Sequence, residues 1–348
     1  MSDAANGTVR RRGRIRVFRA ESMAHTPFDE RSRPSRILKD AGVRFVKRPG
    51  FADVVIARRV NSLKKFGGFD KPFVIWTHEP GWSIVFEPIV DIPGVRNRAH
   101  VMNAYTGGIY ADEFYYFSTI KPDFDVAMRA FVAKPRKVVM LASHKAPSPI
   151  VWNGIDHDLD PYRQNLALYL QDRGFCDIYG RGWPESVKIS GNSRAGKWHA
   201  AKLDILNGYA INLAFENTII PNYVTEKLWD AIVSACLPVY HGARNGIYRI
   251  FPEGSFIEAE GKSVEELGEQ ILAMPKDEMI ARYEVCLRAY LAIFTEDRRR
   301  VSRRACDLRT VRFLESAIGA HAVENPQRVQ PTFWSRLAAR LRPGSHNS

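Results

Sequence analysis

The sequence predicts an α/β fold with two domains, and three observations support this. With 348 residues, the chain is long enough for two domains that each have a core. Apolar runs of strand length recur along it, with helical or loop segments between them. A stretch rich in proline and small polar residues, Ser143–Pro149, has loop character up to about Asp160 and separates two such series. We therefore expect a first domain at residues 1–150, a second at 151–322 and a tail at 323–348.

The first series contains six strand-like runs, which predict a largely parallel sheet. These runs are Ile15–Phe18, Val43–Val46, Asp53–Ala57, Phe73–Thr77, Val101–Tyr105 and Val138–Ala142.

The second series alternates helices and strands and predicts a second α/β domain. Its expected helices are Pro161–Arg173, Lys197–Asn207 and Asn222–Ala235, and its expected strands are Cys176–Tyr179, Ala210–Phe215 and Leu237–Tyr240. Three more helices are expected at Val264–Met274, Lys276–Phe294 and Asp297–Ile318. We expect the last of these to pack back across the first domain.

Composition places the chain among globular proteins. Hydrophobic residues make up 45% of it, but the longest apolar runs are far too short to cross a bilayer. The amino terminus has a basic stretch and no apolar core of signal-peptide length, so we expect a cytoplasmic protein without an anchor helix. The four cysteines stand far apart with no CxxC pair, which argues against a zinc site and favours reduced thiols.

The net charge of +13 predicts an anionic partner, which charge alone does not identify. Nucleic acid, a phosphorylated ligand and an acidic membrane surface all fit. In the tail, Phe333, Trp334, Leu337 and Leu341 fall on one helical stripe, with arginines off it. A basic amphipathic segment of this kind can lie on an anionic membrane, and it can equally be a disordered end or a helix docked on its own protein.

The chemistry is expected where the strand Ala210–Phe215 meets the next helix. Glu216 and Asn217 follow the strand, at the end where open parallel sheets collect ligand groups. Lys227 lies in the first turn of the helix, where free N–H groups and the helix dipole already favour a diphosphate. Glu226 beside it suits sugar or ribose hydroxyls. The alternative is that Thr225, Glu226 and Lys227 form only a helix cap with solvated charges.

The order of motifs in this region resembles a known family. FEN at 215–217, YVTEKL at 223–228 and a P-V-x-x-G strand at 238–242 resemble the donor-site signature of the α-1,3/4-fucosyltransferases, glycosyltransferase family 10. FPEGSFI at 251–257 resembles a second run of that family. The resemblance implies a GT-B architecture, in which two Rossmann-like domains face a central cleft.

The resemblance also implies a function. Fucose would pass from GDP-fucose, with inversion, to a hydroxyl of an oligosaccharide or lipid-linked glycan acceptor, in α-1,3 or α-1,4 linkage. An N-acetylglucosamine-containing bacterial surface saccharide would be such an acceptor. Together with the missing anchor, this suggests an enzyme at the inner face of the bacterial cytoplasmic membrane, with no nucleic-acid partner.

Glu79 is the candidate catalytic base. It follows the expected strand Phe73–Thr77 at its carboxyl end, and the resemblance aligns it with the stretch that holds the catalytic glutamate of the family. Glu87 and His78 are rival candidates, and the structural alternative for Glu79 is a surface-loop carboxylate.

Five residues are candidates for binding the donor: Arg163, Asn217, Tyr223, Glu226 and Lys227. The guanidinium of Arg163 can hold a diphosphate through two parallel hydrogen bonds, although the residue can also be an exposed helix arginine. The resemblance assigns Asn217 and Tyr223 to the donor pocket. It also implies a Tyr-Lys-Phe stretch where this chain has Gly208-Tyr209-Ala210, so one donor-side lysine of the family is missing.

No cofactor is expected. The sequence has no DxD motif at a strand end, although Asp156-His157-Asp158 has that spacing in the loop, and we expect no required metal. Two alternatives stay open. One is a GT-B enzyme that uses another nucleotide sugar, and the other is a non-catalytic basic protein that binds an anionic ligand.

Overall fold

The structure is a computed structural model. It describes residues 15–78, 88–105, 109, 118, 120–152, 154–191, 198–220, 222–242, 245–293 and 296–324. The chain divides into two compact units. Among the described residues, the first contains Ile15–Trp76, Ile89–His100 and Thr310–Glu324, and the second consists mainly of Val101–Arg309.

The second unit is built on a six-stranded parallel sheet with the order β11-β10-β7-β12-β13-β14. Its strands are β7 (Val138–Leu141), β10 (Cys176–Tyr179), β11 (Ile189–Gly191), β12 (Ile211–Leu213), β13 (Leu237–Tyr240) and β14 (Ile257–Glu258). The chain runs outward from β7 through β10 to β11, then returns to the other side of β7 and runs outward again. The strand order therefore reverses between β7 and β12, which is where ligands bind in open α/β sheets.

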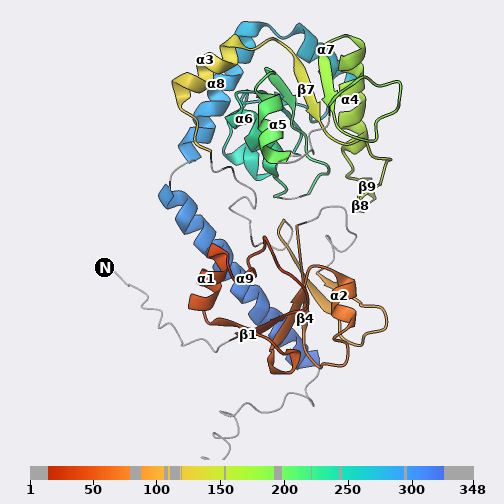
Figure 1. The fold of residues 1–348 in the computed structure, drawn as a ribbon, viewed down its shortest axis with the longest axis vertical. Coiled ribbons are helices and arrows are strands. Elements are labelled where there is room, and N and C mark those ends of the chain that lie inside the picture. Colours follow the sequence, from red (N-terminus) through yellow and green to blue (C-terminus); the bar gives the residue numbers. More distant parts are fainter. Residues whose placement is uncertain are drawn as a thin grey trace, which may run out of the picture. The chain divides into compact units, whose positions relative to one another are not determined.

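Helices of the second unit pack in pairs around this sheet (Figure 1). They are α3 (Phe124–Ala133), α4 (Asp160–Asp172), α5 (Trp198–Leu206), α6 (Glu226–Val233), α7 (Val264–Ala273) and α8 (Lys276–Ile293). Phe131 of α3 stacks on Tyr283 of α8 with ring centroids 4.3 Å apart. Tyr169 of α4 donates to Glu269 of α7 at 2.6 Å. The resulting core is large and continuous, so the strand ends at the reversal point are held by a rigid scaffold.

The first unit has a second six-stranded sheet, ordered β2-β1-β3-β4-β6-β5. Its strands are β1 (Ile15–Arg19), β2 (Val43–Val46), β3 (Val54–Ala57), β4 (Phe73–Thr77), β5 (Ile89–Val90) and β6 (Ala99–Asn103). The pairings of β1 with β2 and β3, and of β3 with β4, are parallel, whereas β5 and β6 run antiparallel. All residues of β3 and β4 are buried, as expected for parallel strands covered on both faces. These two sheets confirm the predicted α/β class with two Rossmann-like domains.

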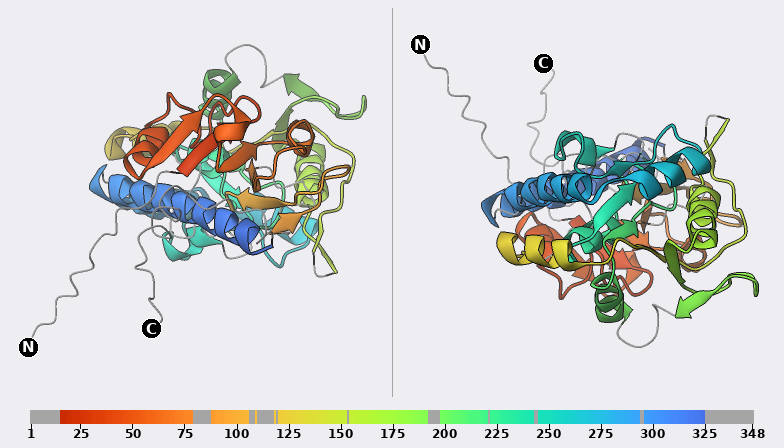
Figure 2. Two further views of the ribbon diagram at one scale, coloured as in Figure 1. Left: turned by 90° about the horizontal axis from the view of Figure 1, so that it is seen from below. Right: turned by 90° about the horizontal axis from the view of Figure 1, so that it is seen from above.

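Three helices complete the first unit: α1 (Arg33–Asp40), α2 (Val60–Lys64) and part of α9 (Glu296–Glu324). Figures 1 and 2 show the second half of α9 running beside the sheet of this unit. Leu314 of α9 is fully buried, and the Nε2 of His321 lies 3.3 Å from a carboxylate oxygen of Asp70. The second half of α9 therefore contributes to the first unit, as the sequence led us to expect for this helix.

The division between the units differs from the predicted boundary at residue 150. Strand β7 and helix α3 precede that boundary, yet β7 is a central strand of the second sheet and α3 packs on α8. The segment predicted to link the domains lies inside the second unit and contains the hairpin of β8 (Val151–Trp152) and β9 (Ile155–Asp156). The loop composition correctly predicted a connection between two elements of secondary structure. However, the strands on its two sides, β7 and β10, belong to the same sheet.

The two aspartates with DxD-like spacing, Asp156 and Asp158, have a structural role in the loop that follows β7. Asp156 accepts hydrogen bonds from the backbone N–H groups of Ile150 and Asp158, and Asp158 accepts from those of Ser148 and Asp160. Both carboxylates therefore fix the shape of the loop.

Candidate donor-binding site

A pocket of about 110 Å³ opens at the reversal point of the second sheet. Leu141, Ala142 and Ser143 line it from the carboxyl end of β7, and Asn212 and Leu213 line it from β12. Its remaining lining residues are polar or charged and come from the flanking loops and helices: Lys145, Arg163, Lys202, Asn217, Glu226 and Lys227. This volume is below that of sites that enclose whole drug-sized ligands, so it fits one part of a nucleotide sugar, such as its diphosphate.

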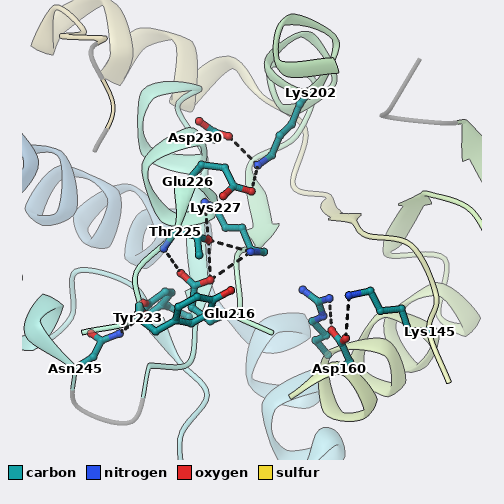
Figure 3. Close-up of polar contacts among 12 residues, drawn as sticks. Lys145, Asp160, Lys202, Glu216, Tyr223, Thr225, Glu226, Lys227, Asp230 and Asn245 are labelled. Atoms are coloured by element: carbon teal, nitrogen blue, oxygen red, sulfur yellow. Dashed lines mark hydrogen bonds and ion pairs between the residues drawn. The ribbon is translucent and has the colours of Figure 1, made fainter. Parts of the chain in front are cut away.

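A buried carboxylate organises the start of α6 at one wall of this pocket. Glu216 is completely buried and accepts hydrogen bonds from the N–H and the hydroxyl of Thr225, both at 2.7 Å. Thr225 also caps the helix, because its hydroxyl oxygen accepts from the N–H of Lys227 at 3.5 Å. The ammonium of Lys227 lies 3.3 Å from Glu216 and 2.9 Å from the Thr225 hydroxyl (Figure 3). This network fixes Lys227 at the helix N-terminus, where the helix dipole adds to its positive charge.

A second cation reaches the pocket from α4. Arg163 is only 4% exposed and forms an ion pair with Asp160, one turn earlier in the same helix. The Nζ of Lys145 lies 3.7 Å from the other oxygen of Asp160 (Figure 3). The Nε of Arg163 is buried and has no hydrogen-bond partner among the described residues. An arginine that keeps a buried donor unused at a pocket wall is suited to an anionic oxygen.

The third group of charges joins α5 and α6. Lys202 of α5 lies 2.7 Å from Asp230 and 3.5 Å from Glu226, both on α6. Burial opposes ionisation of Glu226, but the ammonium groups of Lys227 and Lys202 more than offset it and lower its pKa to about 2. Glu226 is therefore a carboxylate at neutral pH, able to accept hydrogen bonds from hydroxyl groups.

The positive and negative side chains of the site lie at different depths below the pocket surface. Four cations line the pocket, and of the acidic residues that neutralise them only Glu226 lines it as well. The other three acids, Asp160, Glu216 and Asp230, lie behind the wall and are at most 7% exposed. An anion in the pocket would thus face three cations that buried acids hold in place, Arg163, Lys202 and Lys227, together with the more exposed Lys145.

Four of the five predicted donor-binding residues line this one pocket: Arg163, Asn217, Glu226 and Lys227. The alternative of an exposed helix arginine at position 163 is wrong, because the residue is buried. The fifth, Tyr223, does not line the pocket. Its ring is 4% exposed and packs edge-on against Tyr105, with ring centroids 4.7 Å apart.

The candidate base and its rival Glu87 lie outside the described residues. Strand β4 ends at Thr77 as predicted, and His78 directly follows it. Glu79 therefore keeps its predicted place after a strand end in the sequence, and its role stays a prediction.

Five charged residues of the site were not among the sequence candidates: Lys145, Asp160, Lys202, Glu216 and Asp230. Glu216 was visible as a carboxylate after a strand end, but its burial was not. Lys202 supplies a cation to the site from which the family lysine is missing at Gly208-Tyr209-Ala210. No sequence signal places Lys145 or Lys202 here, because their positions depend on β7 and β12 being neighbours.

A larger cavity of about 470 Å³ lies elsewhere in this unit, between α3 and the end of α6. Its lining is mainly alanine and valine, with Lys134 as its cation. The ammonium of Lys134 donates to the carbonyl oxygens of Leu206 and Ala235, and burial lowers its pKa. This lysine is committed to backbone groups, so the cavity is poorly suited to a diphosphate.

The described part of the chain contains no cluster of three or more histidine, cysteine, aspartate or glutamate side chains placed to bind a metal ion. It also contains no helix with the length and apolarity needed to span a membrane. All four cysteines are buried and free of disulfides.

Comparison with known proteins identifies the region that holds the pocket. Residues 142–311 match the family model described as glycosyltransferase family 10 (fucosyltransferase) C-term. A GDP-fucose protein O-fucosyltransferase 3 of Xenopus tropicalis is 31% identical over 121 residues, which cover 34% of this chain and 25% of the relative. The 3-galactosyl-N-acetylglucosaminide 4-alpha-L-fucosyltransferase of Homo sapiens is 31% identical over 125 residues, or 35% of this chain and 30% of the relative. The chain thus spans about a third or less of the length of these relatives.

Among solved structures, an alpha1,3-fucosyltransferase with GDP-fucose has 16% sequence identity and a TM-score of 0.46, over 81% of this chain and 84% of that one. Every lining residue of the pocket except Leu141 falls within residues 142–311. Residues 142–311 therefore match the C-terminal domain of glycosyltransferase family 10, and the family predicted from the motifs is confirmed for this region.

Proposed function

We propose that this protein transfers fucose from GDP-fucose to a hydroxyl group of a glycan acceptor. The observation that carries the proposal is the pocket at the reversal point of the second sheet, with four cations and one ionised carboxylate on its wall. Three of these cations, Lys145, Arg163 and Lys227, match a diphosphate, and the carboxylate matches a hydroxyl-bearing sugar or ribose. The family match and the names of the relatives support fucose as the sugar and GDP as the nucleotide.

The reaction follows from this arrangement. The bond between the fucose anomeric carbon and the β-phosphate oxygen breaks, and the departing GDP takes the electron pair. Arg163 and Lys227 stabilise the negative charge that develops on the diphosphate, and Lys145 and the dipole of α6 add to the field. Glu226 accepts hydrogen bonds from donor hydroxyls. No step of this scheme calls for a cofactor.

The acceptor oxygen attacks the anomeric carbon from the face opposite the diphosphate, which inverts the configuration. We propose that Glu79 accepts the proton of the attacking hydroxyl. A carboxylate has an ordinary pKa near 4.3 and is mostly ionised at neutral pH, so it can act as a base once it is placed next to that hydroxyl.

We further propose an N-acetylglucosamine-containing bacterial surface saccharide as acceptor, with an α-1,3 or α-1,4 linkage. Support comes from the human relative, whose name describes transfer to a galactosyl-N-acetylglucosaminide. Work at the inner face of the cytoplasmic membrane, with the tail at residues 323–348 on anionic lipid, remains part of this proposal. The tail lies almost wholly outside the described residues.

The test is a donor panel. Purified protein is mixed with GDP-fucose, GDP-mannose and UDP-sugars over a glycan array, and both nucleotide release and the labelled glycan are measured. We expect transfer from GDP-fucose and a melting temperature that GDP raises. Transfer only from a different donor would replace fucose in the proposal, and binding of RNA without any effect of GDP would indicate the non-catalytic alternative.

A further inference from the structure

We propose that Lys202 and Asp230 are positioning residues that hold the carboxylate of Glu226 in place for a hydroxyl group of the donor. This inference rests on the proposed function, because it takes Glu226 to be a donor ligand.

The contacts form a chain that runs from behind the pocket wall into the pocket. Asp230 lies 3.3 Å from the Nε2 of His199 through one carboxylate oxygen and 2.7 Å from Lys202 through the other. Lys202 then lies 3.5 Å from one oxygen of Glu226 (Figure 3). Lys202 and Glu226 line the pocket, whereas Asp230 does not. Asp230, at one end of this chain of contacts, is thus held inside the protein, and Glu226, at the other end, faces the pocket.

The spacing on α6 explains why a lysine is needed between the two acids. Glu226 and Asp230 stand four residues apart, so their side chains leave the same face of the helix and repel each other. The side chain of Asp230 is 4% exposed, which leaves little water to screen this repulsion. Lys202 from α5 lies within ion-pair distance of both carboxylates, so it converts a repelling pair into a linked group.

Burial distinguishes this arrangement from a surface ion pair. Lys202 is only 8% exposed, and its closest carboxylate belongs to the most buried member of the group, Asp230. Surface pairs contribute little because both side chains stay free to move. Here Asp230 restrains the ammonium, and the ammonium in turn restrains one oxygen of Glu226. Lys202 contacts only one oxygen of Glu226, and the proposal assigns the donor hydroxyl to the other.

The charged groups that face Glu226 come from several elements. Lys202 and, through Asp230, His199 face it from α5, while Lys227 and Asp230 belong to its own helix. Lys145 and Arg163 line the same pocket from the loop after β7 and from α4. Lys202 and Lys227 are the two cations that lower the pKa of Glu226, so removal of Lys202 should move that pKa back toward its ordinary value.

A charge-balanced double variant tests the proposal. Lys202→Met with Asp230→Asn removes one cation and one anion, so the net charge near the diphosphate is unchanged. Affinities for GDP-fucose and for GDP are measured by calorimetry in the wild type, in this double variant, in Glu226→Gln and in the triple variant. Lys202→Arg with native Asp230 is the conservative control, and melting temperatures report the fold of each.

We expect the double variant to bind GDP-fucose about ten-fold more weakly, in the range of a lost hydrogen bond to a charged group. In the Glu226→Gln background the same two changes should have less than about a two-fold effect. Between pH 6 and pH 4 the affinity of the double variant should fall as Glu226 takes up a proton, while that of the wild type stays constant. Lys202→Arg should retain most of the wild-type affinity.

Two outcomes would overturn the proposal. An effect of equal size with and without Glu226 would mean that Lys202 contacts the donor directly or serves only the fold. An unchanged affinity of the double variant at every pH would mean that Glu226 needs no such support. If Glu226→Gln alone binds GDP-fucose like the wild type, the donor role of Glu226 fails instead, and that result is separate from both.

Discussion

Lys227 offers the most discriminating mutational prediction, because its ammonium group has two roles that separate experimentally. It neutralises Glu216, which is completely buried, and it presents a positive charge to the pocket. Lys227→Met removes both. The prediction is a loss of stability and a loss of donor affinity, and a second substitution restores only the stability.

The structure sets the size of the two losses. Breaking a fully buried ion pair costs about 3–5 kcal/mol, but Thr225 still donates two hydrogen bonds to Glu216, and the Lys227 side chain is 19% exposed. We therefore expect a destabilisation of about 1–3 kcal/mol, near the cost of a poorly satisfied buried group. A lost charge-assisted contact with the diphosphate corresponds to about 1.5–3 kcal/mol, or roughly 10- to 100-fold weaker GDP binding.

Glu216→Gln combined with Lys227→Met separates these effects. The neutral amide can still accept from Thr225, so denaturant unfolding should show much of the stability regained. Calorimetry with GDP should show affinity as low as in Lys227→Met alone. Lys276→Met, at an exposed position on α8, is the matched control and should change neither quantity. If the double variant recovered wild-type GDP affinity, Lys227 would act only as the counter-charge of Glu216 and the reasoning would be refuted.

Three further predictions concern the remaining site residues. Arg163→Lys keeps the positive charge but loses the planar guanidinium that can form two parallel hydrogen bonds, so calorimetric titration should show about ten-fold lower affinity for GDP. Arg181→Lys, at an exposed position, is the control and should leave GDP affinity unchanged. Glu79→Gln should bind GDP normally in that assay yet lose most transfer of labelled fucose, and equal transfer rates would remove the base assignment. The ionised form of Glu226 should stabilise the fold fully above pH 4.5, and this contribution should disappear as pH falls toward about 2. The difference in unfolding free energy between wild type and Glu226→Gln, followed over that range, measures it, and a difference that grew on acidification would contradict the sign.

The local sequence pattern was sufficient to predict strands and helices where residues that are close in the chain are also close in space. The strand before Glu216, the helix after Thr225 and the strand Leu237–Tyr240 follow one another directly in the chain, so Glu226 and Lys227 were placed correctly at a strand end and helix start. The helix begins at Glu226 and not at the predicted Asn222. Thr225 caps it, and Asn222 has a φ of 61°, which no helix residue adopts.

Other parts of the site depend on sheet order, which the local pattern does not contain. Lys145 and Lys202 reach the pocket because β7 and β12 are paired in the sheet although some seventy residues separate them. The same pairing moves β7 into the second unit and shifts the boundary away from residue 150. Tyr223 was assigned to the donor pocket by resemblance alone. It packs against Tyr105 and does not line the pocket described here, so its donor role stays a prediction.

The most direct test of the central claim is a crystal structure of the protein with GDP-fucose bound. We predict that the diphosphate occupies the pocket between β7 and β12, with phosphate oxygens within hydrogen-bond distance of Arg163 and Lys227 and a donor hydroxyl on Glu226. A diphosphate bound elsewhere, with this pocket filled only by water, would contradict it.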